Sequence, residues 1–370
     1  RNRQRTGRSR PTTVTGRWFD IGAAVRRAGS SDGEVTLSRI AFLPGWIVVG
    51  ATTAIFLLGV SIPLSYQLLP LAASVVLFGL PHGAIDHLAI PRTRAEPVTP
   101  GWLAAVGGLY LLVGGAYAAV WFLFPAVAVA FFIGMTWAHW GQGDVYPLVA
   151  FGEGHPRGRA TRLLMGATRG ALPMVVPFVA FPGQYEQIVS TLVGLFDPGS
   201  VEAVSAIFTP TARLWVAIGL GCLIAVTLAV GFLRAGAEGR RSWLLDVGET
   251  GLLVGFFSLV PPILAVGLYF CLWHSLRHIV RLLAVDPAAA SALESRRYLS
   301  ALASFGRDAA PLTAVSLAIL ALWYLVVPGT AAEPLSLVGA YLALIAVLTL
   351  PHVVVVSVMD REQGLWTAAQ

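Results

Sequence analysis

Lysine is absent from this chain, and charge of either sign is scarce. All 25 basic residues are arginine, and charged residues make up only 12% of the 370 residues, whereas 56% are hydrophobic and the mean hydropathy is +0.74. A soluble core of this size could not bury so much apolar surface. The composition therefore excludes an ordinary soluble protein and predicts a chain solvated by lipid.

Several other features are missing. The two cysteines, Cys222 and Cys271, both lie inside apolar runs, so no disulfide framework is expected. The sequence has no P-loop, no G-x-G-x-x-G turn and no H-E-x-x-H zinc motif. Polar and apolar residues do not alternate with a period of two, which argues against a β-barrel. These absences leave an all-α, polytopic transmembrane helix bundle.

Apolar segments long enough to cross a bilayer recur along the chain. About 20 apolar residues span the hydrocarbon core as a helix. By this measure we expect ten spans, at about 41–62, 68–90, 101–124, 125–149, 161–182, 211–234, 243–262, 263–284, 310–328 and 335–359.

The arginines indicate orientation rather than nucleic-acid binding. Most of them lie in the N-terminal region or follow an even-numbered span, whereas the connections 63–67, 183–210, 261–262 and 329–334 contain none. By the positive-inside rule, both termini are cytoplasmic. We therefore expect an Arg-rich cytoplasmic tail without a signal peptide at 1–39, a transmembrane catalytic domain at 40–360 and a short cytoplasmic tail at 361–370.

The second span ends in a polar segment that is unusual for a membrane helix. It reads Gly-Leu-Pro-His-Gly-Ala-Ile-Asp-His over 79–87. Each ionisable group inside a bilayer costs roughly 2.5 kcal/mol or more, so such groups normally face a bundle interior and serve a function. The alternative is a helix end at the lipid headgroups, where polar residues cost little.

Histidines on four even-numbered spans fall at one depth. His82, His139, His274 and His352 lie about 14, 14, 11 and 17 residues from the expected start of their spans. At a rise of 1.5 Å per residue, they share a layer roughly 9 Å thick in the cytoplasmic half of the bilayer. Scattered structural histidines need not share a depth, but the ligands of one metal ion must.

The spacing of the histidines separates stronger from weaker metal ligands. His274 and His278 are four residues apart, on one helix face, and could hold adjacent positions on one ion. His82 and His87 are five apart, so without a helix break only His82 is expected to be a ligand, with His87 near the cytoplasmic boundary. His139, between two tryptophans, is favoured as a ligand.

Two further histidines have weaker assignments. His352 is as consistent with a supporting or substrate-contacting role as with metal binding. His155, between Gly and Pro in a loop, is expected to be solvated.

Carboxylates share the depth of the histidines. Asp86, Asp144, Asp246 and Glu249 could accept hydrogen bonds from metal-bound imidazoles, which fixes the tautomer of the ring. Glu249, at the inner end of the seventh span, is the preferred partner. Ligation by imidazole without thiolate suits iron, zinc or copper.

Aromatic side chains beside these residues could line an apolar substrate tunnel. Each could equally serve in packing. They are Phe131, Phe132, Trp137, Trp140, Tyr269, Phe270 and Trp273.

These motifs, in this order, resemble the Brp/Blh family of integral-membrane β-carotene 15,15′-dioxygenases. The resemblance covers about 68–359 and rests on the motif at 79–86, on His139-Trp140-Gly141 with Asp144, on His274-Ser275-Leu276-Arg277-His278, and on Leu350-Pro351-His352. The chain departs from the family pattern in three features, which are the Arg-rich tail, an extra first span and His87.

The resemblance implies a membrane-embedded non-haem iron enzyme. Its Fe²⁺ would be held by four histidines that map to His82, His139, His274 and His278. The enzyme would cleave β-carotene at the central double bond with O₂ into two retinal molecules, in the plasma membrane, with a functional link to a microbial rhodopsin.

Two other classes remain open from the residues alone. A di-iron membrane hydroxylase or desaturase would also use membrane histidines, but such a site generally needs about eight. A transporter or a haem-binding electron carrier would use histidines as pathway groups or axial ligands. No internal repeat supports a transporter.

Overall fold

A computed structural model describes residues 31–151, 155–237, 239–329 and 333–367, with side chains described from residue 37. Every regular element in these ranges is helical. The elements are α2 (Ser31–Leu57), α3 (Leu64–Gln67), α4 (Leu69–Ser74), α5 (Gly79–Gly83), α6 (Asp86–Arg94), α7 (Pro100–Leu109), η1 (Tyr110–Gly114), α8 (Gly115–Leu123), α9 (Pro125–Phe151), α10 (Arg159–Ala180), α11 (Pro182–Gly194), η2 (Pro198–Ser200), α12 (Val201–Ser205), α13 (Pro210–Ala235), α14 (Arg240–Leu259), α15 (Pro262–Tyr269), η3 (Phe270–Ser275), α16 (Leu276–Val285), α17 (Pro287–Glu294), α18 (Tyr298–Val326) and α19 (Pro334–Glu362).

Within the described residues, nine helical segments are long and apolar enough to cross a membrane. They correspond to nine of the ten expected spans, which confirms the all-α polytopic bundle. The remaining expected span is α9, which is 27 residues long but carries His139, Gln142 and Asp144. These polar side chains lower its hydropathy, and His139 and Asp144 are buried inside the bundle.

Helix starts follow local sequence signals. Proline occupies one of the first two positions of α7, α11, α13, α15, α17 and α19. Proline is favoured there because its fixed φ suits the helix and its missing N–H would have no partner in the first turn. Thr99, Thr209 and Asp286 cap α7, α13 and α17 through their side-chain oxygens.

The N-terminal region differs from the expected tail. Residues 1–30 lie outside the described residues, but α2 begins at Ser31, ten residues before the expected first span. Residues 37–42 contribute Leu37, Ala41 and Phe42 to a buried core. The C-terminal residues behave similarly, since Leu365 is fully buried. Both ends of the described chain are therefore part of the bundle.

The second expected span is not one continuous helix. Between Leu64 and Arg94 it is divided into α3, α4, α5 and α6, with breaks at 68, 75–78 and 84–85. Broken helices at membrane depth are tolerated where they are enclosed by protein. The breaks place His82 on the short helix α5 and Asp86 at the start of α6.

Two π-helices interrupt otherwise continuous helices. η1 lies between α7 and α8, and η3 lies between α15 and α16. A π-helical turn inserts one extra residue and turns the following side chains around the axis, and such turns are frequent at functional sites. η1 begins with Tyr110, and η3 contains His274.

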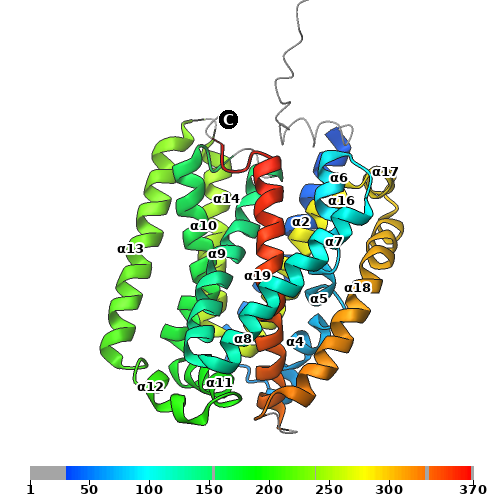
Figure 1. The fold of residues 1–370 in the computed structure, drawn as a ribbon. Coiled ribbons are helices and arrows are strands. Elements are labelled where there is room, and N and C mark those ends of the chain that lie inside the picture. The colour runs from blue at the N-terminus through cyan, green and yellow to red at the C-terminus, as the bar shows by residue number, and fades with distance from the viewer. Residues whose placement is uncertain (1–30, 152–154, 238, 330–332, 368–370) are drawn as a thin grey trace, which may run out of the picture.

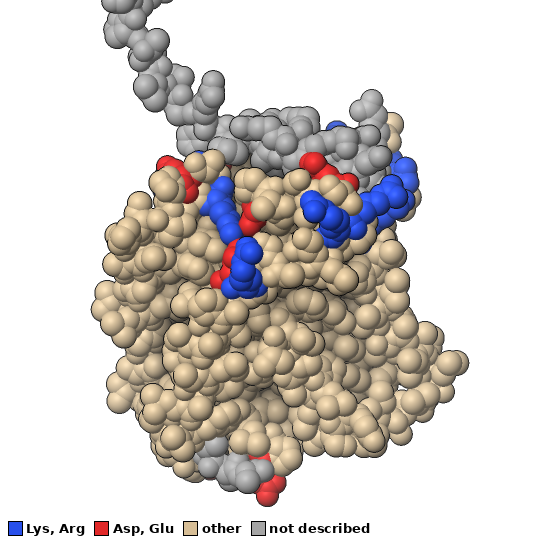
Figure 2. All heavy atoms as spheres, turned by 90° about the vertical axis from the view of Figure 1, so that its right-hand side faces the viewer, with Lys and Arg blue, Asp and Glu red and all other residues tan. Residues whose placement is uncertain are grey.

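The helices form an upright bundle in which α13 and α18 lie at opposite edges and α9 and α19 cross the middle (Figure 1). The start of α2 and the end of α19 lie at the same end of the bundle, as expected for an even number of spans. The face formed by α7 and α18 has its charged side chains gathered toward that end, apart from a small acidic group at the other tip (Figure 2).

Glycines bring α9 and α10 unusually close together. A Cβ placed on Gly141 would lie 1.9 Å from the carbonyl oxygen of Gly166, and one on Gly170 would lie 1.8 Å from that of Trp137. Small residues permit such close packing of membrane helices. This contact fixes the helix that carries His139.

Candidate metal centre

Five histidines from four parts of the chain converge in the interior of the bundle. The ring of His82 lies 5.6 Å from that of His274, 5.7 Å from His278 and 5.0 Å from His352, centroid to centroid. His139 lies 4.8 Å from His274 and 5.0 Å from His352. All five are at most 6% exposed. The expected convergence of histidines from separate spans is present.

The nitrogens of these rings are arranged as metal ligands would be. Nε2 of His139, His274, His278 and His352 is buried without a hydrogen-bond partner among the described residues. One ligand nitrogen from each of His82, His139 and His352 lies within 4.8 Å of the other two. Buried polar atoms normally find partners, so four unpaired imidazole nitrogens within one buried cluster of rings fit the ligands of a bound metal ion.

Hydrogen bonds to the other ring nitrogens fix the orientation of two histidines. Nδ1 of His82 contacts the carbonyl oxygen of Gly79, and Ser275 Oγ lies 3.2 Å away. Nδ1 of His352 lies 2.9 Å from a carboxylate oxygen of Asp86. A histidine that donates its Nδ1–H in this way presents Nε2 as the metal-binding nitrogen.

Asp86 is the carboxylate closest to the centre. Besides His352, it accepts a hydrogen bond of 2.6 Å from Tyr110, the first residue of the π-helix η1. An Asp86 oxygen also lies within 4.8 Å of ligand nitrogens of His278 and His352. Sequence reasoning named Asp86 and His352 but missed Tyr110, because nothing in the local sequence marks the π-helix that aims it.

Asp86→Asn is expected to weaken metal binding about 10–100-fold, because the neutral amide holds and polarises His352 less strongly than the carboxylate does. Iron titration of the purified apoprotein measures this. Asp308→Asn, which alters an arginine contact away from the centre, serves as the control. Unchanged iron affinity of Asp86→Asn would show that this pair does not support the metal.

The ring of His274 rests on a glycine of α9. A Cβ on Gly143 would lie 2.9 Å from Cε1 and 3.0 Å from Nδ1 of His274. Because a contact under 3.0 Å forces a neighbour to move, only glycine leaves the imidazole in this position. His139 lies one helical turn before Gly143, and its Nδ1 is 3.4 Å from Gln142 Oε1.

Gly143→Ala is expected to displace His274 and to lower both iron occupancy and activity. Gly134→Ala is the matched control, because Gly134 lies on the same helix with open space around its Cβ position. Metal content per folded chain is the measurement. Equal iron content in the two variants would contradict the inferred contact.

Glu249 and Asp144 lie in a separate buried ion-pair network rather than beside the histidines. Glu249 accepts hydrogen bonds from Trp46 (2.6 Å) and Arg169 (2.8 Å) and pairs with Arg277. Asp144 accepts from Arg277 at 2.8 Å and from the indole of Trp273. Both Glu249 oxygens and Asp144 Oδ1 therefore accept from arginine or tryptophan, Asp144 Oδ2 lies 3.6 Å from Arg169 Nη1, and the expected pairing of Glu249 with a histidine is not observed among the described residues.

His155 is not solvated as expected. It is 1% exposed, and its Nε2 lies 3.0 Å from Asp246. The ring lies against α13, where the absence of a side chain at Gly231 leaves room for it and for Trp243 of α14. His87 is half-buried outside the histidine cluster, as expected, and lines a cavity.

Two largely apolar cavities meet at the histidine cluster. We call them the inner cavity and the outer cavity. His82, Phe270, Ile345 and Thr349 line both, His139 and His274 line the inner one, and His352 lines the outer one. Their volumes are about 130 and 520 Å³. An elongated apolar molecule occupying both would pass beside the histidines.

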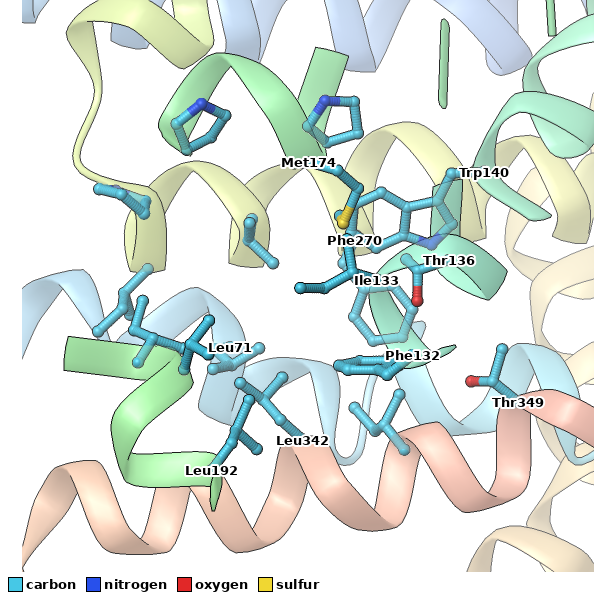
Figure 3. A pocket seen from close by; sticks show the side chains of 18 of the residues that line it. Leu71, Phe132, Ile133, Thr136, Trp140, Met174, Leu192, Phe270, Leu342 and Thr349 are labelled. Carbon is cyan, nitrogen blue, oxygen red and sulfur yellow. The ribbon is translucent and has the colours of Figure 1, made fainter. Parts of the chain in front are cut away.

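Only some of the expected aromatic residues line these cavities. Trp140, Phe132 and Phe270 line the inner cavity and are labelled in Figure 3. Trp137 instead lines a third cavity between α9, α10 and α19 and donates to the carbonyl oxygen of Ala167. Tyr269 and Trp273 are fully buried and line none of the described cavities, and Phe131 is 47% exposed.

Comparison with known proteins agrees with the geometry. A family model described as beta-carotene 15,15′-dioxygenase matches residues 73–360. The chain belongs to this family. The match covers every histidine of the cluster.

Individual relatives carry the same description. A probable beta-carotene 15,15′-dioxygenase Blh of Halobacterium salinarum is 45% identical over 89% of this chain and 95% of its own length. A probable Brp enzyme of the same organism is 32% identical over 91% and 95%. A beta-carotene 15,15′-dioxygenase of an uncultured marine bacterium is 25% identical over 56% of this chain and 66% of its own. No solved structure matches the chain significantly.

Proposed function

We propose that this chain cleaves β-carotene with O₂ at the central 15,15′ double bond into two molecules of retinal, at an Fe²⁺ ion held by the histidine cluster. The observation that carries the proposal is the position of five buried imidazoles where two apolar cavities meet. The family and the names of the relatives support the substrate and the reaction.

The reaction balances without a further reductant. The central C=C bond breaks, and each of its carbons takes one oxygen atom of O₂ to form an aldehyde. Iron supplies activation of O₂ toward the electron-rich polyene. The imidazoles hold the ion, and we include His352 with His82, His139, His274 and His278 because its Nε2 is also unpaired.

The protein residues contribute orientation and exclusion of water. The cavity walls are almost entirely aliphatic and aromatic, which suits a C40 hydrocarbon taken from lipid. Trp140 and Phe270 lie 5.7 and 6.4 Å from the ring of His274. Their flat faces can hold the conjugated chain against the centre.

Localisation follows from the same features. We propose that the chain is a multi-pass protein of the plasma membrane with both termini in the cytoplasm, on the basis of the arginine distribution. Retinal released into the same membrane would be available to a microbial rhodopsin. Di-iron chemistry is less well supported, because the cluster holds five histidines, fewer than the roughly eight that such a membrane site generally needs.

Expression in cells that accumulate β-carotene tests the proposal. We expect the cells to lose colour and to yield retinal on pigment extraction, and we expect purified protein to contain iron without the Soret band of a haem. An unchanged carotene content in cells that contain folded, iron-loaded protein would contradict the proposed reaction.

A further inference from the structure

The two cavities differ in their access to the surface. None of the residues lining the inner cavity is exposed. Six residues that line the outer cavity are exposed, and all of them lie on α7 or α18. They are Leu103, Gly107, Pro311, Leu312, Val315 and Ile319.

The exposed lining residues lie on the apolar face of the bundle. Val315 is 51% exposed, Leu103 is 44% and Ile319 is 39%. α7 packs against α6 and η1, whereas α18 packs against α5, α16, α17 and α19. The charged side chains of this face are gathered toward one end (Figure 2). The outer cavity therefore opens between two apolar helices, at a depth where lipid rather than water surrounds the protein.

The inner cavity extends away from the histidines to a closed end. Trp140 and Thr136 lie at one end of it, and Leu192 of α11 lies at the other (Figure 3). Leu192 is 3% exposed and Val189 is 6%. α11 follows α10 directly and packs against α19, so it closes this end of the cavity.

We propose that the polyene enters from the membrane between α7 and α18, and that the inner cavity receives the leading half and sets which bond lies at the metal. This proposal rests on the proposed carotene cleavage. It adds the direction from which the substrate enters and the reason why one double bond is cleaved rather than another. Once the leading ring meets the closed end, the distance from that end to the histidines fixes the cleaved bond. The inner cavity must widen to admit the ring, and the flexible side chain of Met174 in its wall can move aside.

The proposal separates two kinds of variant. Val315→Trp fills the opening, so retinal formation should fall about tenfold while retinal remains the product. Leu322→Trp is the matched control, because Leu322 lies two turns further along the exposed side of α18, is 59% exposed and lines none of the described cavities.

Leu192→Phe shortens the inner cavity, so cleavage should shift to a neighbouring double bond and give two aldehydes of unequal length. Leu195→Phe, also buried but outside the cavity, is its control.

The experiment compares these variants with the natural protein in carotene-accumulating cells, by chromatography and mass spectrometry of the products and by iron content per folded chain. If the natural protein makes no retinal, the proposed function fails. If it does, but Val315→Trp is as fast as Leu322→Trp, the entrance is wrong. If Leu192→Phe makes only retinal at the natural rate, the inner cavity does not set the cleaved bond.

An inactive Leu192→Phe variant is also decisive. The inactive variant is then assayed with an apocarotenal, a carotenoid that lacks one ring and the adjoining part of the polyene. Its shorter end can enter the shortened inner cavity. Cleavage of this substrate supports the length limit. No cleavage by the folded, iron-containing variant overturns it.

Discussion

His278→Ala is expected to abolish retinal formation and to remove the bound iron together. Nε2 of His278 is buried and has no hydrogen-bond partner in the part of the chain that the structure describes, and its ring lies 5.7 Å from that of His82 and 5.3 Å from that of His352. Removing one imidazole from a group that binds a single ion lowers the affinity for the ion and also changes its coordination geometry. We expect the same result for His82, His139 and His274. Iron content and retinal yield per folded chain are the measurements.

His87→Ala is the control for this series, because His87 lies outside the cluster although it lines the outer cavity. It should keep its iron. His352→Ala tests the fifth histidine, and loss of iron would place it among the ligands. An inactive variant that retains full iron content would instead remove the replaced histidine from the set of ligands.

Glu249→Ala is expected to destabilise the fold by about 3 kcal/mol, because the buried Arg169 and Arg277 would then share one carboxylate, Asp144, in place of two. Both guanidinium groups are at most 1% exposed, so water cannot replace the lost charge. Glu294→Ala, an exposed change on α17, should shift stability by no more than about 0.5 kcal/mol. Denaturation in detergent micelles measures both variants.

The same variant separates two roles for Glu249. If it only neutralises the arginines, the chains that remain folded should bind iron normally. Lower iron affinity with unchanged stability would instead restore Glu249 as a partner of a metal-bound histidine, as the sequence suggested.

The sequence predicted the features that depend on composition and repeated spacing. Apolar length predicted the helical spans, and the shared depth of the histidines predicted their convergence. The first prediction depends on the thickness of the bilayer and the second on the rise per residue of a helix, and both lengths can be applied along the sequence without knowing how the helices pack.

The sequence did not predict features that depend on how helices break and rotate. The breaks around α5 and the π-helix η1 place Asp86 beside His352 and Tyr110 beside Asp86. Glu249 shares the depth of the histidines but lies on a helix rotated toward Arg169 and Arg277. Trp137 and Trp140 are neighbours in sequence, yet only Trp140 lines the inner cavity. Depth can be read from a sequence, but the direction of a side chain around the bundle cannot.

X-ray absorption at the iron edge of the purified protein tests the central claim most directly. We predict a single iron per chain whose scattering is that of several imidazole rings, with that signal weakened in His352→Ala. Sulfur ligands, an iron–iron distance or a porphyrin pattern would contradict a mononuclear histidine centre.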